Sequence, residues 1–256
     1  NITGKKDAEA AKNEFNISGG EFTSEVKQDY CKDTFEVKAG PDGKYTVEQS
    51  NDVAKVGGTG YTTLEAALAA LNETNHTLTL IDSSKWPAAT PVYWKTNGEW
   101  AAVATLTDAL KAAYMANAGD ITIVCRPGAD VGTMTHGHVA DNLTIYGNNA
   151  YISGGECDLE VDTYKFSRDT GAQANDGVTL DKKITITAYE LDNLGVWGER
   201  HTNYNVNVVL TDCDGNDKVV PNVQRVYISG TTGENNIMLI GCDFLTKATA
   251  VYSNAD

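Results

Sequence analysis

One pattern of apolar and polar positions occurs twice in this chain, about 42 residues apart. Each copy has the i, i+3, i+4, i+7 spacing of a helix with one buried face. Each also begins with a Thr that is followed three residues later by an acid, Thr62 with Glu65 and Thr105 with Asp108, a pairing that satisfies free amides at a helix start. The apolar positions are 64, 67, 68 and 71 in the first copy and 106, 109, 110 and 113 in the second.

The pattern therefore predicts two short amphipathic helices, with Leu68 and Leu110 buried at equivalent positions. Each helix leads into a β-branched run, at 77–81 and at 120–124, that is typical of a strand. A helix that covers the end of a stack of strands buries the apolar end and blocks open edges.

From residue 120 onward, short β-branched runs alternate with a period of two and are separated by Gly, Asn and Asp. Equivalent runs recur about every 22 to 30 residues, apart from a longer interval near 155–183, which suits one turn of a parallel β-helix with unequal loops. The alternative, a β-sandwich, would show more regular hairpin signals. The runs are 121–124, 143–146, 184–187, 206–210, 226–228 and 237–240.

The earlier part of the chain carries turn signals. Pro41-Asp42-Gly43 predicts a hairpin turn, and the polar stretch at 49–52 predicts a boundary. Asn97-Gly98 lies between two aromatic-rich runs and predicts a second hairpin over 92–103.

Composition excludes several classes of protein. The net charge of −15 repels phosphate backbones, so we expect no nucleic-acid partner. The apolar fraction of 41% is too high for a disordered chain, and no apolar run is long enough to insert in a membrane. No signal peptide is visible and the chain opens Asn1-Ile2-Thr3, so we interpret it as a segment of a longer protein.

The segment 106–256 resembles a right-handed parallel β-helix of the pectin-lyase-like type. The resemblance rests on the helix at 106–116, the run at 121–124, Gly241-Cys242-Asp243-Phe244 and the run at 248–252. The segment 17–47 resembles the module that closes such helices in large repetitive surface proteins of gut Firmicutes, and 53–82 resembles the connector that opens the next unit.

The expected fold is thus an all-β solenoid, a right-handed parallel β-helix capped by a short amphipathic helix and preceded by small α+β connector units. The expected division is 1–50 as the closing segment of a preceding β-helix unit, 51–104 as a connector with helix and hairpin, and 105–256 as the capping helix and parallel β-helix.

Catalytic and metal sites have few signals. Polysaccharide lyases of this fold need clustered acids and a nearby Arg or Lys, and Arg126-Pro127 is one fragment of such a motif; the signatures of the glycoside hydrolases are missing. His136 and His138 with Asp141 have zinc-ligand character, and the alternative is a polar loop. We expect no catalytic residue, no metal and no cofactor. Four aspartates could align across successive coils as an acidic stripe, either one that binds Ca²⁺ weakly or a solvated edge. They are Asp212, Asp214, Asp217 and Asp243.

The five cysteines are scattered without CxxC spacing, which predicts small buried apolar residues rather than a zinc site or a disulfide framework. Cys213 and Cys242 each precede an Asp and follow a β-branched run. We expect the two side chains to lie close together in successive coils. They can form a disulfide there, but the fold does not require one.

The resemblance implies a piece of a secreted or cell-wall-anchored adhesin-like protein, in a class of which some members engage host glycoproteins such as immunoglobulins and mucins. Because the enzyme signatures are missing, we expect a non-catalytic module, and we expect it to be a monomer that binds such a host macromolecule. The alternative is a carbohydrate-active enzyme of the same fold. The negative charge disfavours acidic glycans, so we expect a neutral glycan or a protein surface. Large aromatic and cationic residues in loops are the candidate contacts, because such residues dominate binding hot spots. They are Trp197, Arg200 and Tyr204 in the bend 195–204, and Tyr93, Trp94 and Trp100 in the hairpin 92–100. The alternative is that these aromatic side chains pack on the fold, Trp197 on a coil and the hairpin on the cap helix, and for the hairpin core packing is favoured.

Overall fold

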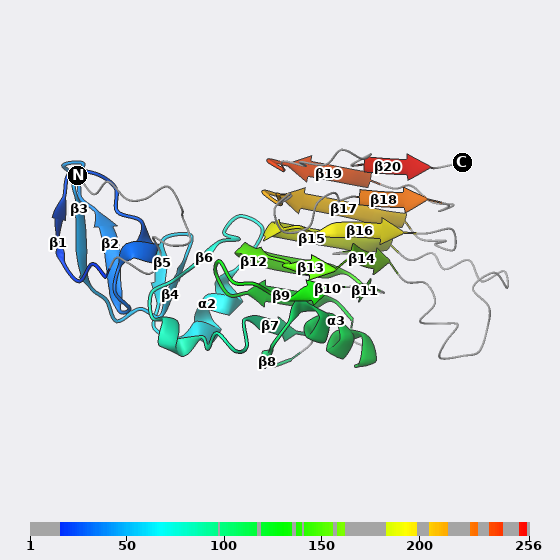
Figure 1. Ribbon diagram of the computed structural model, residues 1–256, viewed down its shortest axis with the longest axis horizontal. Helices are drawn as coiled ribbons and strands as arrows, with labels where there is room; N and C mark the ends of the chain where they lie inside the picture. Colours follow the sequence, from blue (N-terminus) through cyan, green and yellow to red (C-terminus); the bar gives the residue numbers. More distant parts are fainter. Residues whose placement is uncertain are drawn as a thin grey trace. The chain divides into compact units, whose positions relative to one another are not determined.

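A computed structural model of the chain describes most of it, in two compact units, Asn1–Pro87 and Ala88–Asp256 (Figure 1). The predicted three-segment division remains a prediction. The described residues are 16–96, 98–116, 119–134, 137–139, 141–155, 158–161, 183–198, 205–214, 226–229, 236–242 and 251–254.

The first unit begins with a three-stranded antiparallel sheet in the order β1-β3-β2. The predicted turn at Pro41-Asp42-Gly43 is confirmed, because it joins β2 to β3 and Gly43 has the positive φ that such a turn needs. A short 3₁₀ helix, η1 (Gln28–Tyr30), precedes β2. The strands are β1 (Gly20–Phe22), β2 (Phe35–Ala39) and β3 (Tyr45–Gln49).

The second sheet of this unit contains the first copy of the repeated pattern. The hairpin β4–β5 leads into α2 and then into β6, which returns to pair antiparallel with β4, so the sheet order is β5-β4-β6. A second 3₁₀ helix, η2 (Ser83–Lys85), follows. The elements are β4 (Ala54–Val56), β5 (Thr59–Tyr61), α2 (Leu64–Ala70) and β6 (Leu78–Leu80).

Helix α2 starts one residue later than predicted. The cap is Thr63, whose Oγ1 accepts a hydrogen bond from the amide of Ala66 at 3.2 Å, so the predicted Thr62–Glu65 pairing is wrong. The predicted burial of Leu68 is confirmed, at 3% exposed. Two adjacent threonines offer the same side chain, and the sheet that α2 packs against decides which one becomes the cap.

The second unit opens with the same order of elements. The hairpin β7 (Val92–Lys95) and β8 (Ala101–Val103) leads into α3 (Leu106–Met115), and β9 (Ile121–Cys125) then pairs antiparallel with β7. The predicted cap is confirmed here. Thr105 Oγ1 accepts from the Asp108 amide at 3.0 Å and donates to Asp108 Oδ2 at 2.8 Å. All four predicted apolar positions of α3 are buried, Leu110 among them at 2% exposed.

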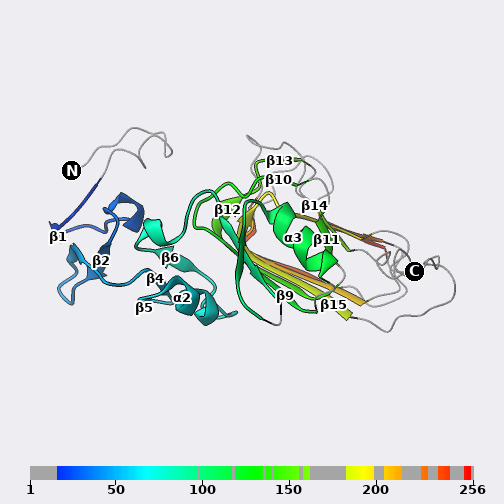
Figure 2. The ribbon, with the colours of Figure 1, turned by 90° about the horizontal axis from the view of Figure 1, so that it is seen from below.

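Parallel strands continue from β9. They build a seven-stranded sheet in the order β19-β17-β15-β12-β9-β7-β8, in which only the β7–β8 end is antiparallel, and a five-stranded parallel sheet in the order β11-β14-β16-β18-β20 (Figures 1 and 2). A small two-stranded parallel sheet joins β10 to β13. The strands are β10 (Thr133–Met134), β11 (Gly137–Val139), β12 (Leu143–Tyr151), β13 (Gly154–Gly155), β14 (Asp158–Val161), β15 (Lys183–Asp192), β16 (Gly195–Gly198), β17 (Asn205–Thr211), β18 (Val226–Ser229), β19 (Asn236–Ile240) and β20 (Val251–Asn254).

The predicted fold class, an all-β solenoid formed by a right-handed parallel β-helix, is wrong for this chain. The described residues form separate sheets, the largest of which is mixed, and the first unit is built from two antiparallel sheets with a helix. The strand runs from 143 and 184 do pair in parallel, with Leu143 opposite Ile186. Periodicity identified the strands, but it does not determine which strand edges pair with each other. Strand β9 pairs in parallel with β12 on one edge and antiparallel with the hairpin strand β7 on the other.

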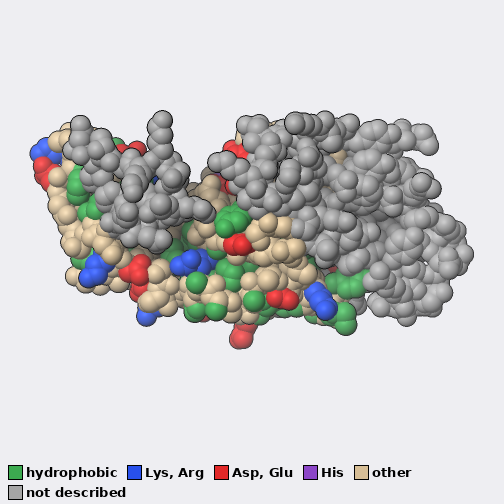
Figure 3. Space-filling model, in the orientation of Figure 1, with side chains coloured by type: hydrophobic (Ala, Val, Ile, Leu, Met, Phe, Trp, Pro, Cys, Tyr) green, Lys and Arg blue, Asp and Glu red, His purple; other side chains and the backbone are tan. Residues whose placement is uncertain are grey.

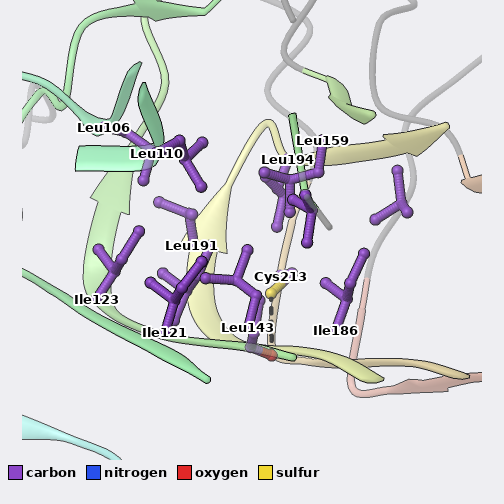
Figure 4. Packing of buried hydrophobic residues seen from close by; sticks show 14 of the residues in the cluster. Leu106, Leu110, Ile121, Ile123, Leu143, Leu159, Ile186, Leu191, Leu194 and Cys213 are labelled. Carbon is purple, nitrogen blue, oxygen red and sulfur yellow. Dashed lines mark hydrogen bonds between the residues drawn. The ribbon is translucent and has the colours of Figure 1, made fainter. Parts of the chain in front are cut away.

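One hydrophobic core fills the second unit. Figure 4 shows Leu110 of α3, Ile123 of β9 and Leu143 of β12 in the same cluster as Leu159 of β14. Helix α3 contacts strands of both large sheets, β7 and β11, and in Figure 2 it lies over the space between those sheets. No helix among the described residues is long and apolar enough to cross a membrane.

Candidate functional site

The predicted aromatic hairpin divides its side chains between the two faces of the seven-stranded sheet. Trp94, on the same face as the buried Val92, packs against the core, so its role as a partner contact is not favoured. Tyr93 and Lys95 occupy the alternate positions of β7 and lie on the opposite face. Trp100 is half-buried, and the Lys95 ammonium lies 4.7 Å from the centre of its ring. The hairpin thus presents Tyr93, Lys95 and Trp100 together.

The second predicted contact is only partly described. Residues 195–198, predicted as a bend, form strand β16, in which Trp197 lies opposite Tyr227 of β18. Arg200 and Tyr204 lie outside the described residues, and the Trp197 side chain is not described. This contact stays a prediction.

The face that carries Tyr93 and Lys95 extends across the whole seven-stranded sheet, and we call it the outer face. Its residues alternate with those of the core cluster, which come from the other face of the same strands. Because the parallel strands pair in register, equivalent outer residues line up in rows across the sheet, at the strand spacing of about 4.8 Å.

The central row of the outer face is formed mainly by β-branched residues. Three consecutive strands contribute Thr122, Thr144 and Thr187, all half-buried. Lys95 continues the row at the hairpin, and Met238 ends it on β19, where its side chain is 56% exposed. In full, the row is Lys95, Thr122, Thr144, Thr187, Val209 and Met238.

A row of amides runs beside the threonines. Asn236 Nδ2 donates to Asn207 Oδ1 at 3.0 Å, and Asn207 Nδ2 donates to Thr185 Oγ1 at 3.5 Å. Asn142 continues the row: its Oδ1 accepts from the Thr185 amide and its Nδ2 donates to Asp120 Oδ1, both at 2.9 Å. These bonds hold the amide groups in fixed orientations.

The third row contains tyrosines. Tyr146 and Tyr189 stack with ring centres 5.4 Å apart and planes only 6° from parallel. Their exposed fractions are 7% and 8%, so the rings are packed rather than projecting. The row runs Tyr93, Val124, Tyr146, Tyr189, Thr211 and Ile240.

Charge is sparse on these rows. The chain carries −15 overall, but the three rows contain one lysine, Lys95, and one carboxylate, Asp120, at their ends. In Figure 3, acidic and basic side chains are scattered among hydrophobic and uncharged ones on the side in view. The rows offer hydroxyl and amide groups that hydrogen-bond without a net charge. Sequence reasoning missed them, although the alternation that predicted the strands also places Thr122 and Thr144 on one face.

The buried carboxylate of the first unit is structural. Glu36 is 4% exposed and forms ion pairs with Lys55 and Lys38. Burial alone would raise the pKa of Glu36, but hydrogen bonds from Lys55 and Lys38 outweigh it and hold the pKa below its usual value. A cleft of about 470 Å³ lies beside this pair, and its charged lining is Glu25, Lys27 and Lys55. Since Lys55 already pairs with Glu36, the cleft offers few free groups for a ligand.

The metal candidates are not brought together among the described residues, where no group of three His, Cys, Asp or Glu side chains is placed to hold an ion. Asp141 is half-buried, His136 lies outside the described residues, and the His138 side chain on β11 is not described. Asp212 and Asp214 are exposed at the end of β17, whereas Asp217 and Asp243 lie outside the described residues. The acidic stripe therefore stays untested.

The predicted contact between Cys213 and Cys242 is confirmed, since the two thiols hydrogen-bond to each other. Cys213 is buried, Cys242 is half-buried, and both are free thiols. The other described cysteines are Cys125, whose complete burial raises its pKa to about 12, and Cys31, whose pKa is also raised by burial.

Comparison with protein-family models, with curated proteins and with solved structures gives no match for this chain.

Proposed function

We propose that this chain is a non-catalytic binding module of a secreted or wall-anchored bacterial surface protein, acting as a monomer, and that its outer face holds a neutral glycan chain of a host glycoprotein such as a mucin or an immunoglobulin. The bacterial surface and the host partner rest on the family resemblance. The glycan and the face that binds it rest on the in-register threonine and amide rows and on the aromatic side chains at the hairpin end.

The regular spacing of the rows favours a polymer as the bound partner. A repeating chain needs repeating partners, and Thr122, Thr144 and Thr187 supply equivalent hydroxyl groups on three adjacent strands, about 4.8 Å apart. Threonine hydroxyls and asparagine amides donate and accept hydrogen bonds, as sugar hydroxyls do. At the hairpin end, Trp100 and Tyr93 add aromatic rings with polar tips, which suit partners that are apolar on one face and wet on the other.

Charge supports a neutral partner. The three rows, with one lysine and one carboxylate at their ends, neither attract nor strongly repel an uncharged chain. The rest of the protein, with its net charge of −15, disfavours sialylated or sulfated chains.

The test is binding of the whole chain to an array of neutral and acidic glycans, and to mucin and immunoglobulin before and after deglycosylation. We expect binding to neutral glycans and loss of glycoprotein binding after deglycosylation. Binding that survives deglycosylation, or no binding to any of these partners, would contradict the proposal. Release of new reducing ends from a bound polymer would instead support the carbohydrate-active enzyme.

Point variants locate the contact. Thr144→Glu puts a charge in the middle of the central row and should weaken binding about tenfold or more, because the charge must be desolvated by the bound chain. Thr74→Glu makes the same change at an exposed loop position of the first unit and should bind like the parent. Trp197→Ala and Arg200→Ala test the other predicted contact. If those variants lose binding while Thr144→Glu keeps it, the outer face is not the site.

A further inference from the structure

The two contacting thiols occupy equivalent positions on adjacent strands. Strands β17 and β19 pair in register up to Thr211 opposite Ile240, and each strand then makes the same left-handed turn, at Asp212 with φ 50° and at Gly241 with φ 65°. The turns lie against each other, because the Asp212 amide donates to the Ile240 carbonyl at 2.8 Å. Cys213 and Cys242 follow these turns and keep the register of their strands.

The sulfur atoms also have equivalent surroundings. Cys213 Sγ lies 3.4 Å from the carbonyl oxygen of Thr211, two residues before it, and 3.6 Å from that of Ala188 on the preceding strand. Cys242 Sγ lies 3.5 Å from the carbonyl oxygen of Ile240 and 3.4 Å from that of Leu210. Ala188 and Leu210 are themselves register partners. The two thiols are therefore stacked one strand apart.

The two thiols differ in exposure. Cys213 is part of the hydrophobic core, as Figure 4 shows, whereas Cys242 is half-buried at the margin of the core. The hydrogen bond from Cys213 stabilises the Cys242 thiolate and lowers the pKa of Cys242 to about 7, although burial and the nearby Asp214 oppose this. The same contact, together with burial, raises the pKa of Cys213. An accessible thiolate beside a protonated thiol is the arrangement of a nucleophile with its resolving partner.

We propose that Cys213 and Cys242 form a thiol–disulfide exchange site for small disulfides, in which Cys242 attacks and Cys213 resolves. This inference is independent of the proposed glycan binding. The ligand class is a low-molecular-weight disulfide, RSSR, which is also the oxidant.

The reaction has two steps. The Cys242 thiolate attacks one sulfur of RSSR, which forms the bond Cys242–S–S–R, breaks the original S–S bond and releases RS⁻. Cys213 then gives up its proton to the released thiolate or to water and attacks the Cys242 sulfur, which forms the Cys213–Cys242 disulfide and releases a second RS⁻. Counted from two protonated thiols, the cysteine pair loses two electrons and two protons, one proton when Cys242 forms its thiolate and one from Cys213, and RSSR becomes two RSH.

The disulfide should be easily reduced again. Residues that are register partners on neighbouring parallel strands are separated by about 4.8 Å, which lies within the Cα–Cα range of about 4.4 to 6.8 Å that a disulfide spans. The bond can therefore form without a large movement of the strand ends, and because Cys242 is half-buried the disulfide is partly exposed to a reducing thiol. The pair is thus suited to reversible exchange more than to permanent cross-linking.

The experiment treats the full chain with oxidised glutathione, quenches with acid, and maps the products by mass spectrometry after trypsin digestion. Cys213 and Cys242 fall in different tryptic peptides, 201–218 and 226–247, so their disulfide appears as a cross-linked pair. We expect this pair to form and to disappear under mild reduction by excess glutathione. Its absence under oxidation, or the same extent of cross-linking to Cys31 or Cys157, would overturn the proposal.

Two serine variants separate the roles of the thiols. Cys213→Ser should accumulate a stable glutathione adduct on Cys242, because the resolving thiol is gone. Cys242→Ser should react at Cys213 at least about tenfold more slowly, because Cys213 is buried and protonated. Cys31→Ser is the matched control and should leave the cross-link unchanged. Equal adduct formation in the first two variants would overturn the assignment.

A pH series gives a readout that does not depend on a variant. In the parent, adduct formation at Cys242 should rise about tenfold per pH unit below pH 7 and level off above it, as the thiolate population saturates. The ionisable groups that face Cys242 from the end of β17 are Cys213 and Asp214. A rate that keeps rising to pH 9 would show that Cys242 is an ordinary thiol and would overturn its role.

Discussion

The segments 54–80 and 92–125 contain the same four elements in the same order, yet they form the base of different structures. In both, a hairpin is followed by a helix and by a strand that pairs antiparallel with the first hairpin strand, so the sheet orders β5-β4-β6 and β8-β7-β9 are equivalent. In the first copy the described sheet ends at β6. In the second, β9 accepts β12 in parallel on its free edge, and three more strands follow.

The two copies also differ on the face away from the helix. Lys55 of β4 and Tyr93 of β7 hold equivalent register positions, since each is the middle partner of its hairpin. Lys55 pairs with the buried Glu36 and so joins the first copy to the β1-β3-β2 sheet. Tyr93 instead begins a row of the outer face. The same backbone unit therefore connects two sheets through an ion pair in one place and begins the outer face in the other, and the equivalent positions carry a lysine and a tyrosine.

The largest expected effect distinguishes the two helices. Leu110→Ala should cost about 4 kcal/mol, because α3 buries four residues in the large core, and a leucine removed from such a site leaves a cavity. Leu68→Ala should cost about 2 kcal/mol, near the low end of such changes, because α2 buries only Ala67 and Leu68. Urea unfolding monitored by hydrogen exchange in each unit measures both. Equal costs would show that the two helices are equally embedded.

The second prediction concerns the ion pair in the first unit. Glu36→Gln should destabilise Asn1–Pro87 by about 2 kcal/mol at pH 7, since it removes a buried charge that is hydrogen-bonded to Lys55, and should leave the second unit unchanged. Thermal unfolding at pH 7 measures the difference, and the exposed Glu65→Gln is the matched control.

The same carboxylate predicts a pH dependence. The pKa of Glu36 is lower in the folded protein than in the unfolded chain. Its contribution to the free energy of unfolding is therefore fully present above the unfolded pKa of about 4.3 and is lost as the pH falls through the folded pKa. The difference in stability between the parent and Glu36→Gln should therefore disappear on acidification below about pH 4. A difference that persists at low pH would mean that packing of the side chain, and not its charge, is responsible.

A smaller effect compares the helix starts. Thr105→Ala and Thr63→Ala should each cost about 1 kcal/mol, because each threonine oxygen accepts an amide hydrogen bond at the start of its helix. Thr62→Ala is the control and should be close to neutral, since Thr62 is exposed and is not the cap. Chemical denaturation gives all three values. A Thr62→Ala cost as large as that of Thr63→Ala would contradict the observed start of α2.

The smallest effect concerns the hairpin. Lys95→Ala should lower stability by about 0.5 kcal/mol through loss of its contact with the Trp100 ring, and Lys95→Arg should retain most of it. Tryptophan fluorescence during denaturation reports on this site. No difference between the alanine and arginine variants would show that the cation–ring contact contributes nothing to stability.

Sequence reasoning predicted the helices because their spacing is local: Leu106 to Ala113 lie on one face whatever the rest of the chain does. It also predicted the Cys213–Cys242 contact, because equivalent positions in parallel runs stack. It left two roles open for the aromatic hairpin, core packing and partner contact, and favoured core packing. Trp94 does pack on the core, whereas Tyr93 lies on the other face of the sheet, and the aromatic pattern does not reveal which face the sheet will cover. The rows of the outer face needed the registers of five strand pairs, and register is a long-range property.

What the sequence alone determined about this protein is the set of elements: two amphipathic helices of matching pattern, a series of short alternating strands, and a strongly acidic composition. These depend on spacing within a few residues and on counting charges. Only the tertiary structure decided that the strands form separate sheets, that the largest is mixed, and that threonines, amides and tyrosines far apart in the chain line up on one face. The physical reason is that strand pairing joins distant segments through backbone groups that every residue possesses, so the choice of partner is made by packing of the whole unit.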